Sequence, residues 1–168
     1  WDASVYAIRY TLNLWSNFTY FLDEEVNGDQ FEQKDERWIY GGKSDYRQEL
    51  TLASLPLVNR YGAEYRYDDI DEVGLYKTEG QKRLGPVRSD SVDEWNIGIY
   101  AENQIAWNDN IRSILGARYE YFNFDVESRI DRNINGIDLG ANSGQENDDQ
   151  LSLNGSLIYA FNSEWESY

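Results

Sequence analysis

The 168-residue sequence contains no cysteine and no histidine. Without cysteine the chain cannot form disulfide bonds or thiolate metal sites, and without histidine it lacks the usual proton shuttle and the commonest metal ligand. A Ser–His catalytic pair is excluded for the same reason. The many carboxylates could form acid–base pairs in any number of ways, so their presence alone does not indicate catalysis. We therefore expect a protein that is not an enzyme and that has no cofactor.

Positive charge is also scarce. The chain has 15 Lys and Arg residues against 31 Asp and Glu residues, which gives a formal net charge of -16. Binding to phosphate groups requires clustered cations, and the sequence shows no basic stripe. Nucleic acid is therefore not an expected partner.

Long hydrophobic runs are missing as well. No stretch of about 18 apolar residues is present, which excludes a transmembrane helix. A membrane location is not excluded, because a transmembrane β-strand shows only its alternate residues to lipid. The 14 Tyr, 6 Trp and 6 Phe residues fit that class, since such barrels carry aromatic girdles at both membrane interfaces.

What the sequence does contain is alternation of polar and apolar residues with a period of two, which predicts six strands and the start of a seventh. The predicted strands cover residues 4–21, 37–53, 59–68, 93–107, 111–124 and 150–161. Connections 22–36, 69–92 and 125–149 are long, whereas 54–58, 108–110 and 162–164 are short. We therefore predict an all-β fold, an antiparallel up-and-down meander of about six to seven strands. Short periplasmic turns would lie at one edge and longer extracellular loops at the other.

The hairpin from Glu94 to Phe124 shows the alternation most clearly. From Trp95 to Trp107 the odd positions are apolar or small apart from one Asn, and the even positions are mixed polar. The strand that begins at Ile111 repeats this pattern after a turn of three polar residues. If Trp107 pairs with Ile111, the apolar faces of the two strands coincide.

The spacing of the two tryptophans favours a membrane hairpin over a soluble one. Trp95 and Trp107 lie twelve residues apart, which corresponds to about 40 Å of strand at about 3.3 Å per residue. At a tilt of about 45° the vertical separation is about 28 Å, close to the apolar band of about 25 Å in a barrel. A soluble sandwich or lipocalin-like barrel would bury this face in its core and would not need its largest aromatics at both strand ends.

The two faces of the predicted strands supply the candidate functional residues. The apolar face carries an aromatic girdle, formed by Trp95, Trp107, Tyr119 and Tyr121. The opposite face is expected to line a lumen and to contact a plug or a substrate; its candidates are Glu64, Arg66, Tyr100, Glu102, Arg118 and Glu120. The alternative for this second set is a paired network that only satisfies buried charges.

Carboxylates cluster in the predicted long loops, where they would normally serve only to solvate the loop tips. The alternative is a calcium site, because Ca²⁺ takes several oxygen ligands. Its candidate ligands are Asp68, Asp69, Asp71 and Glu72. None of the clusters has the spacing of an EF-hand loop.

Several strand phrases are similar to those of a known family. They are Gly98–Ile105, Leu115–Phe122, Gly62–Asp68, Asp29–Gln33 and Gly155–Tyr159. The phrases resemble the barrel domain of TonB-dependent outer-membrane receptors. That resemblance implies a barrel of about 22 strands around an N-terminal plug, with energy supplied by an inner-membrane complex that pulls on a short N-terminal box. This sequence shows neither plug nor box.

Six or seven strands cannot close a bacterial barrel, which needs an even number and at least eight, because an open edge leaves backbone groups unpaired in lipid. Residues 1–168 are therefore expected to be part of a larger transmembrane barrel domain, without a plug domain. The first residue is Trp1, and no charged segment followed by an apolar one precedes the first strand. We thus expect no signal peptide in this chain.

The resemblance implies a segment of a receptor for active uptake of a scarce nutrient, most often a ferric siderophore, in the outer membrane of a Gram-negative cell. The implied partners are outer-membrane lipid, the protein's own plug domain and remaining strands, the TonB-type energy-coupling complex and the ferric chelate. Two alternatives stay open: a piece of a passive or structural outer-membrane barrel, and a soluble secreted acidic β-domain that binds cations or sugars. The resemblance implies that the specificity for the transported ligand lies in the loops and the plug.

Overall fold

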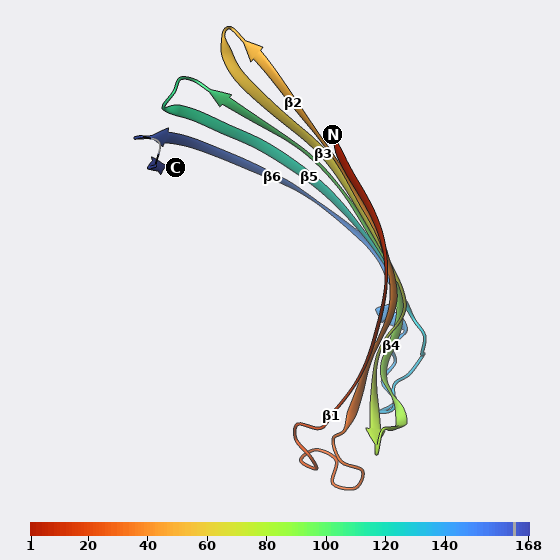
Figure 1. Ribbon diagram of the computed structural model, residues 1–168. Helices are drawn as coiled ribbons and strands as arrows, with labels where there is room; N and C mark the ends of the chain where they lie inside the picture. Colours follow the sequence, from red (N-terminus) through yellow and green to blue (C-terminus); the bar gives the residue numbers. More distant parts are fainter. Residues whose placement is uncertain (163) are drawn as a thin grey trace.

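The computed structural model describes every residue except 163 and forms one antiparallel sheet of seven strands in chain order (Figure 1). The strands are β1 (Asp2–Ser16), β2 (Phe31–Leu52), β3 (Leu55–Glu79), β4 (Lys82–Ala106), β5 (Ile111–Ser128), β6 (Gly144–Ala160) and β7 (Glu166–Ser167). A single 3-10 turn, η1 (Gly140–Asn142), precedes β6. The predicted all-β, up-and-down antiparallel meander is confirmed.

The register predicted for the central hairpin is also confirmed. On β4 and β5, Ala101 lies opposite Ala117 and Ile99 lies opposite Tyr119. The turn is held by the side chain of Asn108, whose Oδ1 accepts hydrogen bonds from the backbone N–H groups of residues 110 and 111 at 2.9 Å each. An asparagine that bonds to the backbone two or three residues ahead is a common way to fix such a turn.

The predicted long loop at 69–92 is wrong. Strand β3 continues to Glu79 and β4 begins at Lys82, so that only Gly80 and Gln81 connect them. Both have positive φ angles, +54° and +66°, as a tight two-residue hairpin turn requires. The loop asymmetry therefore holds only in part, because two long connections, 17–30 and 129–143, share their end of the sheet with this tight turn. Strands β2 and β6 likewise begin six residues earlier than predicted, at Phe31 and Gly144.

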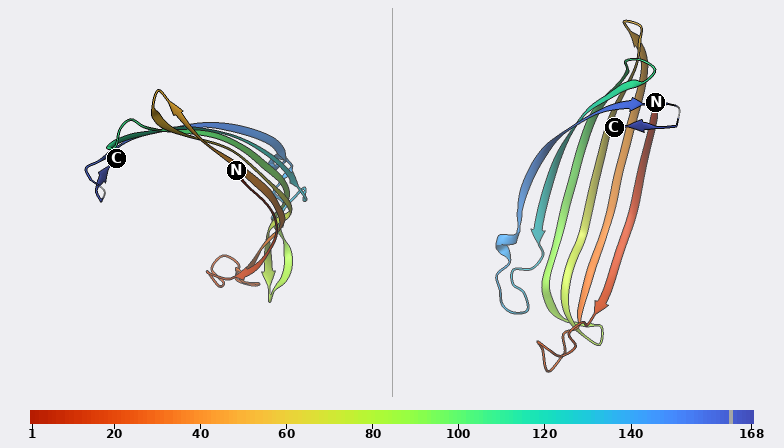
Figure 2. Two further views of the ribbon diagram at one scale, coloured as in Figure 1. Left: turned by 45° about the horizontal axis from the view of Figure 1, so that its top comes forward. Right: turned by 90° about the vertical axis from the view of Figure 1, so that its left-hand side faces the viewer.

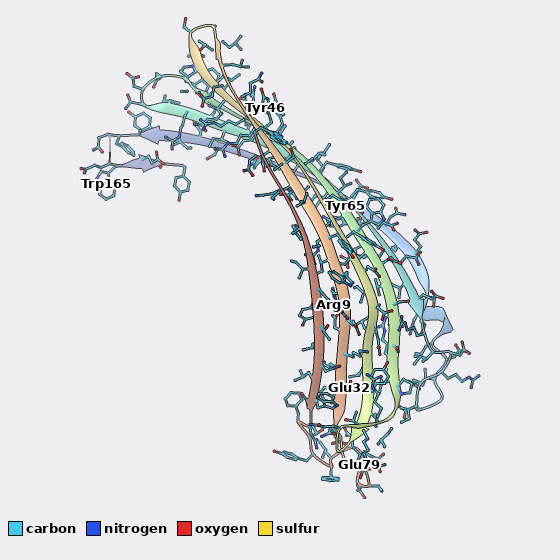
Figure 3. The ribbon with its side chains drawn as sticks, turned by 45° about the vertical axis from the view of Figure 1, so that its right-hand side comes forward. Arg9, Glu32, Tyr46, Tyr65, Glu79 and Trp165 are labelled. Atoms are coloured by element: carbon cyan, nitrogen blue, oxygen red, sulfur yellow. The ribbon has the colours of Figure 1, made fainter. Side chains whose placement is uncertain are left out.

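The sheet is a single curved layer (Figure 2). We call the end that carries residues 53–54 and 107–110 the turn end, and the end with the two long connections the loop end. Tyr46 lies near the turn end and Glu79 at the loop end (Figure 3). Only three apolar side chains are buried among the described residues, because a single layer has no second layer to pack against. No helix in the described part of the chain is long and apolar enough to cross a membrane.

The two faces of this layer differ in chemistry, and we name them by their residues. The tryptophan face carries Trp95 and Trp107, and the arginine face carries Arg66 and Arg118, as the register places Arg66 opposite residue 96 and Arg118 opposite Tyr100. Large aliphatic side chains are exposed on the tryptophan face; Leu153, for example, is 74% exposed.

A β-bulge in β3 changes which residues of that strand belong to each face. Ile70 lies opposite Arg37 of β2, but Glu72 lies opposite Glu36, so residue 71 is extra. Before the bulge, the odd residues of β3 belong to the tryptophan face; after it, the even residues do. The bulge lies next to Asp69, which is opposite Trp38 of β2. Trp38 belongs to a row of aromatic side chains on the tryptophan face.

Candidate functional site: the arginine face

The six predicted lumen residues, spread over β3, β4 and β5, all lie on the arginine face. The cross-strand register places them as follows: Glu64 opposite Gly98, Gly98 opposite Glu120, Arg66 opposite Asn96, Tyr100 opposite Arg118, and Glu102 opposite Gly116. They therefore share a face, as the alternation predicts. That this face lines a lumen stays a prediction.

Arg118 lies at the centre of a network that joins β5 to β3 across β4. Its Nη2 donates to Glu64 Oε2 and to Glu120 Oε1, each at 2.8 Å. The side chain reaches Glu64 by passing over Gly98 of the intervening strand, where an added Cβ would lie 2.9 Å from Arg118 Nη2. Gly98 is therefore the position that makes this contact between non-adjacent strands possible.

Tyr100 makes a second contact of the same kind. Its ring lies over Gly62 of β3, where an added Cβ would lie 2.2 Å from the ring. Its hydroxyl donates a hydrogen bond to Asp45 of β2, and its ring lies 5.8 Å from the guanidinium carbon of Arg118. Sequence reasoning missed Asp45, because the contact skips one strand and needs the register of three.

The other two predicted residues belong to separate ion pairs. Glu102, which the hairpin register puts diagonal to Arg118, is instead 3.9 Å from Arg60. Arg66 pairs with Asp68 at 2.9 Å. The sequence carried a signal for the second pair, since residues i and i+2 of a strand lie on the same face.

This spacing recurs along the arginine face. Arginine and carboxylate two residues apart form ion pairs at Asp35–Arg37, Arg47–Glu49, Arg66–Asp68, Arg88–Asp90 and Arg118–Glu120. Each guanidinium is therefore neutralised by a partner on its own strand. These five arginines are therefore paired, which accords with the alternative of a mutually satisfied network around them.

A cavity of about 390 Å³ opens over the Arg118 network. Its lining on the arginine face comes from Glu64, Tyr100, Glu102, Arg118, Ser152 and Asn154. These groups offer hydrogen-bond donors and acceptors; ion pairs hold Glu64, Glu102 and Arg118 in place, and a hydrogen bond to Asp45 holds Tyr100. Such a surface suits the docking of a polar protein segment or a polar solute.

The four calcium candidates do not converge. All four lie within β3 and not in a loop. Three of them bind separate cations: Asp68 binds Arg66, Asp71 binds Arg129 at 2.6 Å and Glu72 binds Lys34 at 2.7 Å. Asp68 and Asp69 point to opposite faces because they are adjacent in a strand. Within residues 1–162 and 164–168 no group of three or more carboxylates is placed to hold a metal ion.

The four predicted girdle residues all belong to the tryptophan face, three of them near one another and Trp107 at the other end of the strand. The rings of Trp95 and Tyr121 lie 5.5 Å apart, Tyr119 is one pair further along β5, and Trp107 lies at the turn end. Sequence reasoning missed that the aromatic row continues across the sheet. The rings of Trp38 and Tyr40 are stacked 6.0 Å apart, and Tyr40 is 6.3 Å from Tyr67, which pairs with Trp95.

The one polar residue between the two tryptophans on this face of β4 is also satisfied. Asn103 donates from Nδ2 to Asn59 Oδ1 on β3 at 2.7 Å. An amide facing hydrocarbon costs free energy unless it finds such a partner.

Beyond the aromatic row, towards the loop end, the tryptophan face becomes polar. Lys34 Nζ lies 2.7 Å from Glu72, and Arg83 binds Glu32 through two hydrogen bonds of 2.7 and 2.9 Å. The guanidinium of Arg83 stacks 3.6 Å from the ring of Tyr76, whose hydroxyl donates to Glu72. Burial alone would raise the pKa of the Glu72 carboxyl, but the hydrogen bonds from Lys34 and Tyr76 outweigh it and lower that pKa.

The Arg118 network yields a prediction about stability. Arg118→Met removes two charged hydrogen bonds and leaves two carboxylates facing each other, so the free energy of unfolding should fall by about 1–3 kcal/mol. Arg47→Met is the matched control, because its partner Glu49 is largely exposed and such a pair contributes about 0–1 kcal/mol. Urea unfolding of the intact protein in detergent micelles measures both. Equal losses in the free energy of unfolding for the two variants would show that the Arg118 network stabilises the fold no more than an exposed ion pair does.

The Glu72 contact yields a prediction about pH. A carboxyl whose pKa is lowered in the folded state stabilises that state above its unfolded pKa, and the stabilisation disappears as the pH falls through the folded value. The amides of the β2–β3 segment around Lys34 should therefore exchange with deuterium faster, relative to intrinsic rates, below about pH 4. In Glu72→Gln this segment should lose protection already at pH 7 and show no further pH step. A full acid step in the variant would contradict the assignment.

The comparison with known families agrees with this arrangement. The family described as TonB dependent receptor-like, beta-barrel, matches residues 1–168. A search of curated proteins gives no match. In this chain, the seven-stranded antiparallel meander has one face with exposed apolar side chains and an aromatic row, and an opposite face with arginine–carboxylate pairs. The family match covers the whole length of this meander. The chain therefore belongs to the β-barrel domain family of TonB-dependent outer-membrane receptors.

Proposed function

We propose that this chain forms part of the wall of a receptor that actively imports a scarce nutrient, a ferric siderophore, across the outer membrane of a Gram-negative cell. The observation that carries the proposal is the difference between the two faces within a barrel of this family. The tryptophan face would contact lipid, since it exposes aliphatic side chains next to an aromatic row. The arginine face would line the lumen, since charged groups in a membrane protein face its interior.

The open edges support a larger barrel. Among the described residues β1 pairs only with β2, and β7 pairs with just two residues of β6. In lipid each unpaired backbone group costs several kcal/mol, so further strands of the same barrel would complete both edges. We propose that residues 1–168 are a partial barrel domain and that the other strands lie elsewhere in the protein.

The paired charges on the arginine face suggest how the barrel holds a plug. A plug would rest against the polar cavity around Arg118, where the fixed groups form hydrogen bonds without leaving a charge unpaired. Energy for transport would come from a TonB-type complex that acts on the plug. The wall itself would perform no catalysis.

The proposed orientation predicts opposite effects for two arginine substitutions on β6. Leu153 lies in the same cross-strand row as Ala117 and Ala101. Ala101 is halfway between Trp95 and Trp107, so this row would lie near the bilayer midplane. Leu153→Arg would therefore place a charge there, at a cost of about 2–4 kcal/mol. Gln150 lies opposite Glu120 on the arginine face, so Gln150→Arg should be tolerated. The folded fraction in outer-membrane extracts, read from heat-modifiable gel mobility, distinguishes the two. Equal tolerance, or a folded water-soluble product, would reject the membrane orientation.

Active uptake yields a separate prediction. Cells that lack the receptor should fail to accumulate radiolabelled iron supplied as one member of a siderophore panel, and expression of the receptor should restore accumulation. A protonophore, or loss of the energy-coupling complex, should abolish the restored uptake, because transport against a gradient needs energy. Restored uptake that persists without energy would instead identify a passive barrel.

A further inference from the structure

A second cavity opens on the arginine face near the loop end of the sheet. It is separate from the cavity over the Arg118 network. Its volume is about 550 Å³, which lies within the range of small-molecule sites. Strands β1 to β5 all contribute to it. The lining side chains on this face are Leu12, Gln33, Asp35, Val73, Leu75, Arg88, Asp90, Val92 and Val126.

Most of this lining is aliphatic, which is unusual for a face that is otherwise charged. The register explains how it forms: Val73 lies opposite Asp90, and Val92 lies opposite Val126. Because of the bulge in β3, Val73 and Leu75 replace even residues on this face. An apolar wall of this kind favours the burial of an apolar molecular surface.

One oxygen of a carboxylate that lines the cavity lacks a hydrogen-bond partner among the described residues. The side chain of Asp90 is 1% exposed, and its Oδ2 accepts a hydrogen bond from Arg88 Nε. Its Oδ1 is buried and has no hydrogen-bond partner among the described residues. Buried polar atoms are nearly always satisfied in folded proteins, and Asp90 lines this cavity, so its unsatisfied oxygen points to a donor supplied from outside the described wall.

The cations around the cavity are already paired. Arg88 binds Asp90 and Arg37 binds Asp35. The backbone of Lys34 borders the cavity, but its Nζ binds Glu72 on the tryptophan face. An anionic group could bind here only if it first displaced a carboxylate from its guanidinium, which disfavours the binding of anions.

We propose that this cavity, the Asp90 cavity, binds an apolar part of the imported molecule and that Asp90 Oδ1 accepts a hydrogen bond from an N–H or O–H group on it. The ligand part that fits is neutral or cationic, with an apolar body, and it carries no carboxylate or other anion. This inference rests on the proposed function, because it treats the arginine face as the inner wall of an importer.

Four probes with the same phenyl body test the chemistry. They are 2-phenylethylamine, a cationic donor; 2-phenylethanol, a neutral donor; ethylbenzene, which has no donor; and 3-phenylpropionate, an anion. Ligand-observed NMR titration of the intact receptor in detergent should rank the amine first, the alcohol second and ethylbenzene third, with no saturable binding of the anion. Equal binding of the amine and the anion would overturn the proposal.

Asp90→Asn tests the role of the acceptor. The Asn side-chain oxygen can still accept from Arg88, and its NH₂ group, a donor, then takes the place of the acceptor Oδ1. Affinity for 2-phenylethylamine should then fall by about 10- to 100-fold, since a charged hydrogen bond is lost, while ethylbenzene should bind as before. Asp69→Asn is the matched control: Asp69 is an exposed carboxylate on the tryptophan face, and its change should leave all four affinities unaltered.

Leu75→Ala provides a variant that keeps Asp90. It should weaken the three uncharged or cationic probes to a similar extent, because it removes apolar surface that all of them contact. If Asp90→Asn leaves amine binding unchanged while energy-dependent uptake persists, the Asp90 cavity is wrong and the proposed function survives. If the probes bind as predicted but uptake does not depend on energy, the proposed function fails and the cavity assignment stands.

Discussion

Hydrocarbon offers no hydrogen-bond partner to a backbone N–H or C=O group, so a β-strand that contacts lipid must be paired along both edges. The continuous ladders on both sides of β2, β3, β4 and β5 meet this requirement over nearly the whole length of these strands. Because the ladders satisfy the backbone, the sheet needs no apolar core. Its large apolar side chains are free to face outwards, as Leu153 and Leu157 do. In the barrel that we propose, the same constraint makes the open edges at β1 and at β6–β7 the places where neighbouring strands would pair.

Because successive side chains of a strand point to opposite faces, the two faces of this single layer can have different chemistry. Each strand gives one row of side chains to the tryptophan face and one to the arginine face. A single extra residue in β3, next to Ile70, exchanges the rows on that strand near the aromatic row that marks the membrane boundary on the proposed orientation. On the loop-end side of this point the tryptophan face is polar, with Lys34 and Glu72 paired. The arginine face gains Val73 and Leu75 and with them the Asp90 cavity.

How much of this could be predicted from the sequence depends on where the alternation stays simple. Between Trp95 and Tyr121 one face is apolar and the other polar, so register and turn followed directly from the pattern. The strands within segment 69–92 were not predicted, because both faces of the segment carry polar residues and the bulge interrupts the two-residue alternation. A polar sequence without alternation is typical of a loop. The contact from Arg118 to Glu64 could not be predicted from one hairpin, since it crosses a strand at Gly98 and needs the β3–β4 register.

In the proposed orientation the tryptophan face contacts lipid and the arginine face does not. Because the chain has no cysteine, single cysteines at successive positions from 96 to 105 can each carry a spin label in the receptor within its membrane. Collision with oxygen, which concentrates in lipid, and with a water-soluble nickel complex reports the surroundings of each label. If the tryptophan face contacts lipid, oxygen accessibility peaks at every odd position and nickel accessibility at every even one. A profile without this two-residue period, or with its phase reversed, would contradict it.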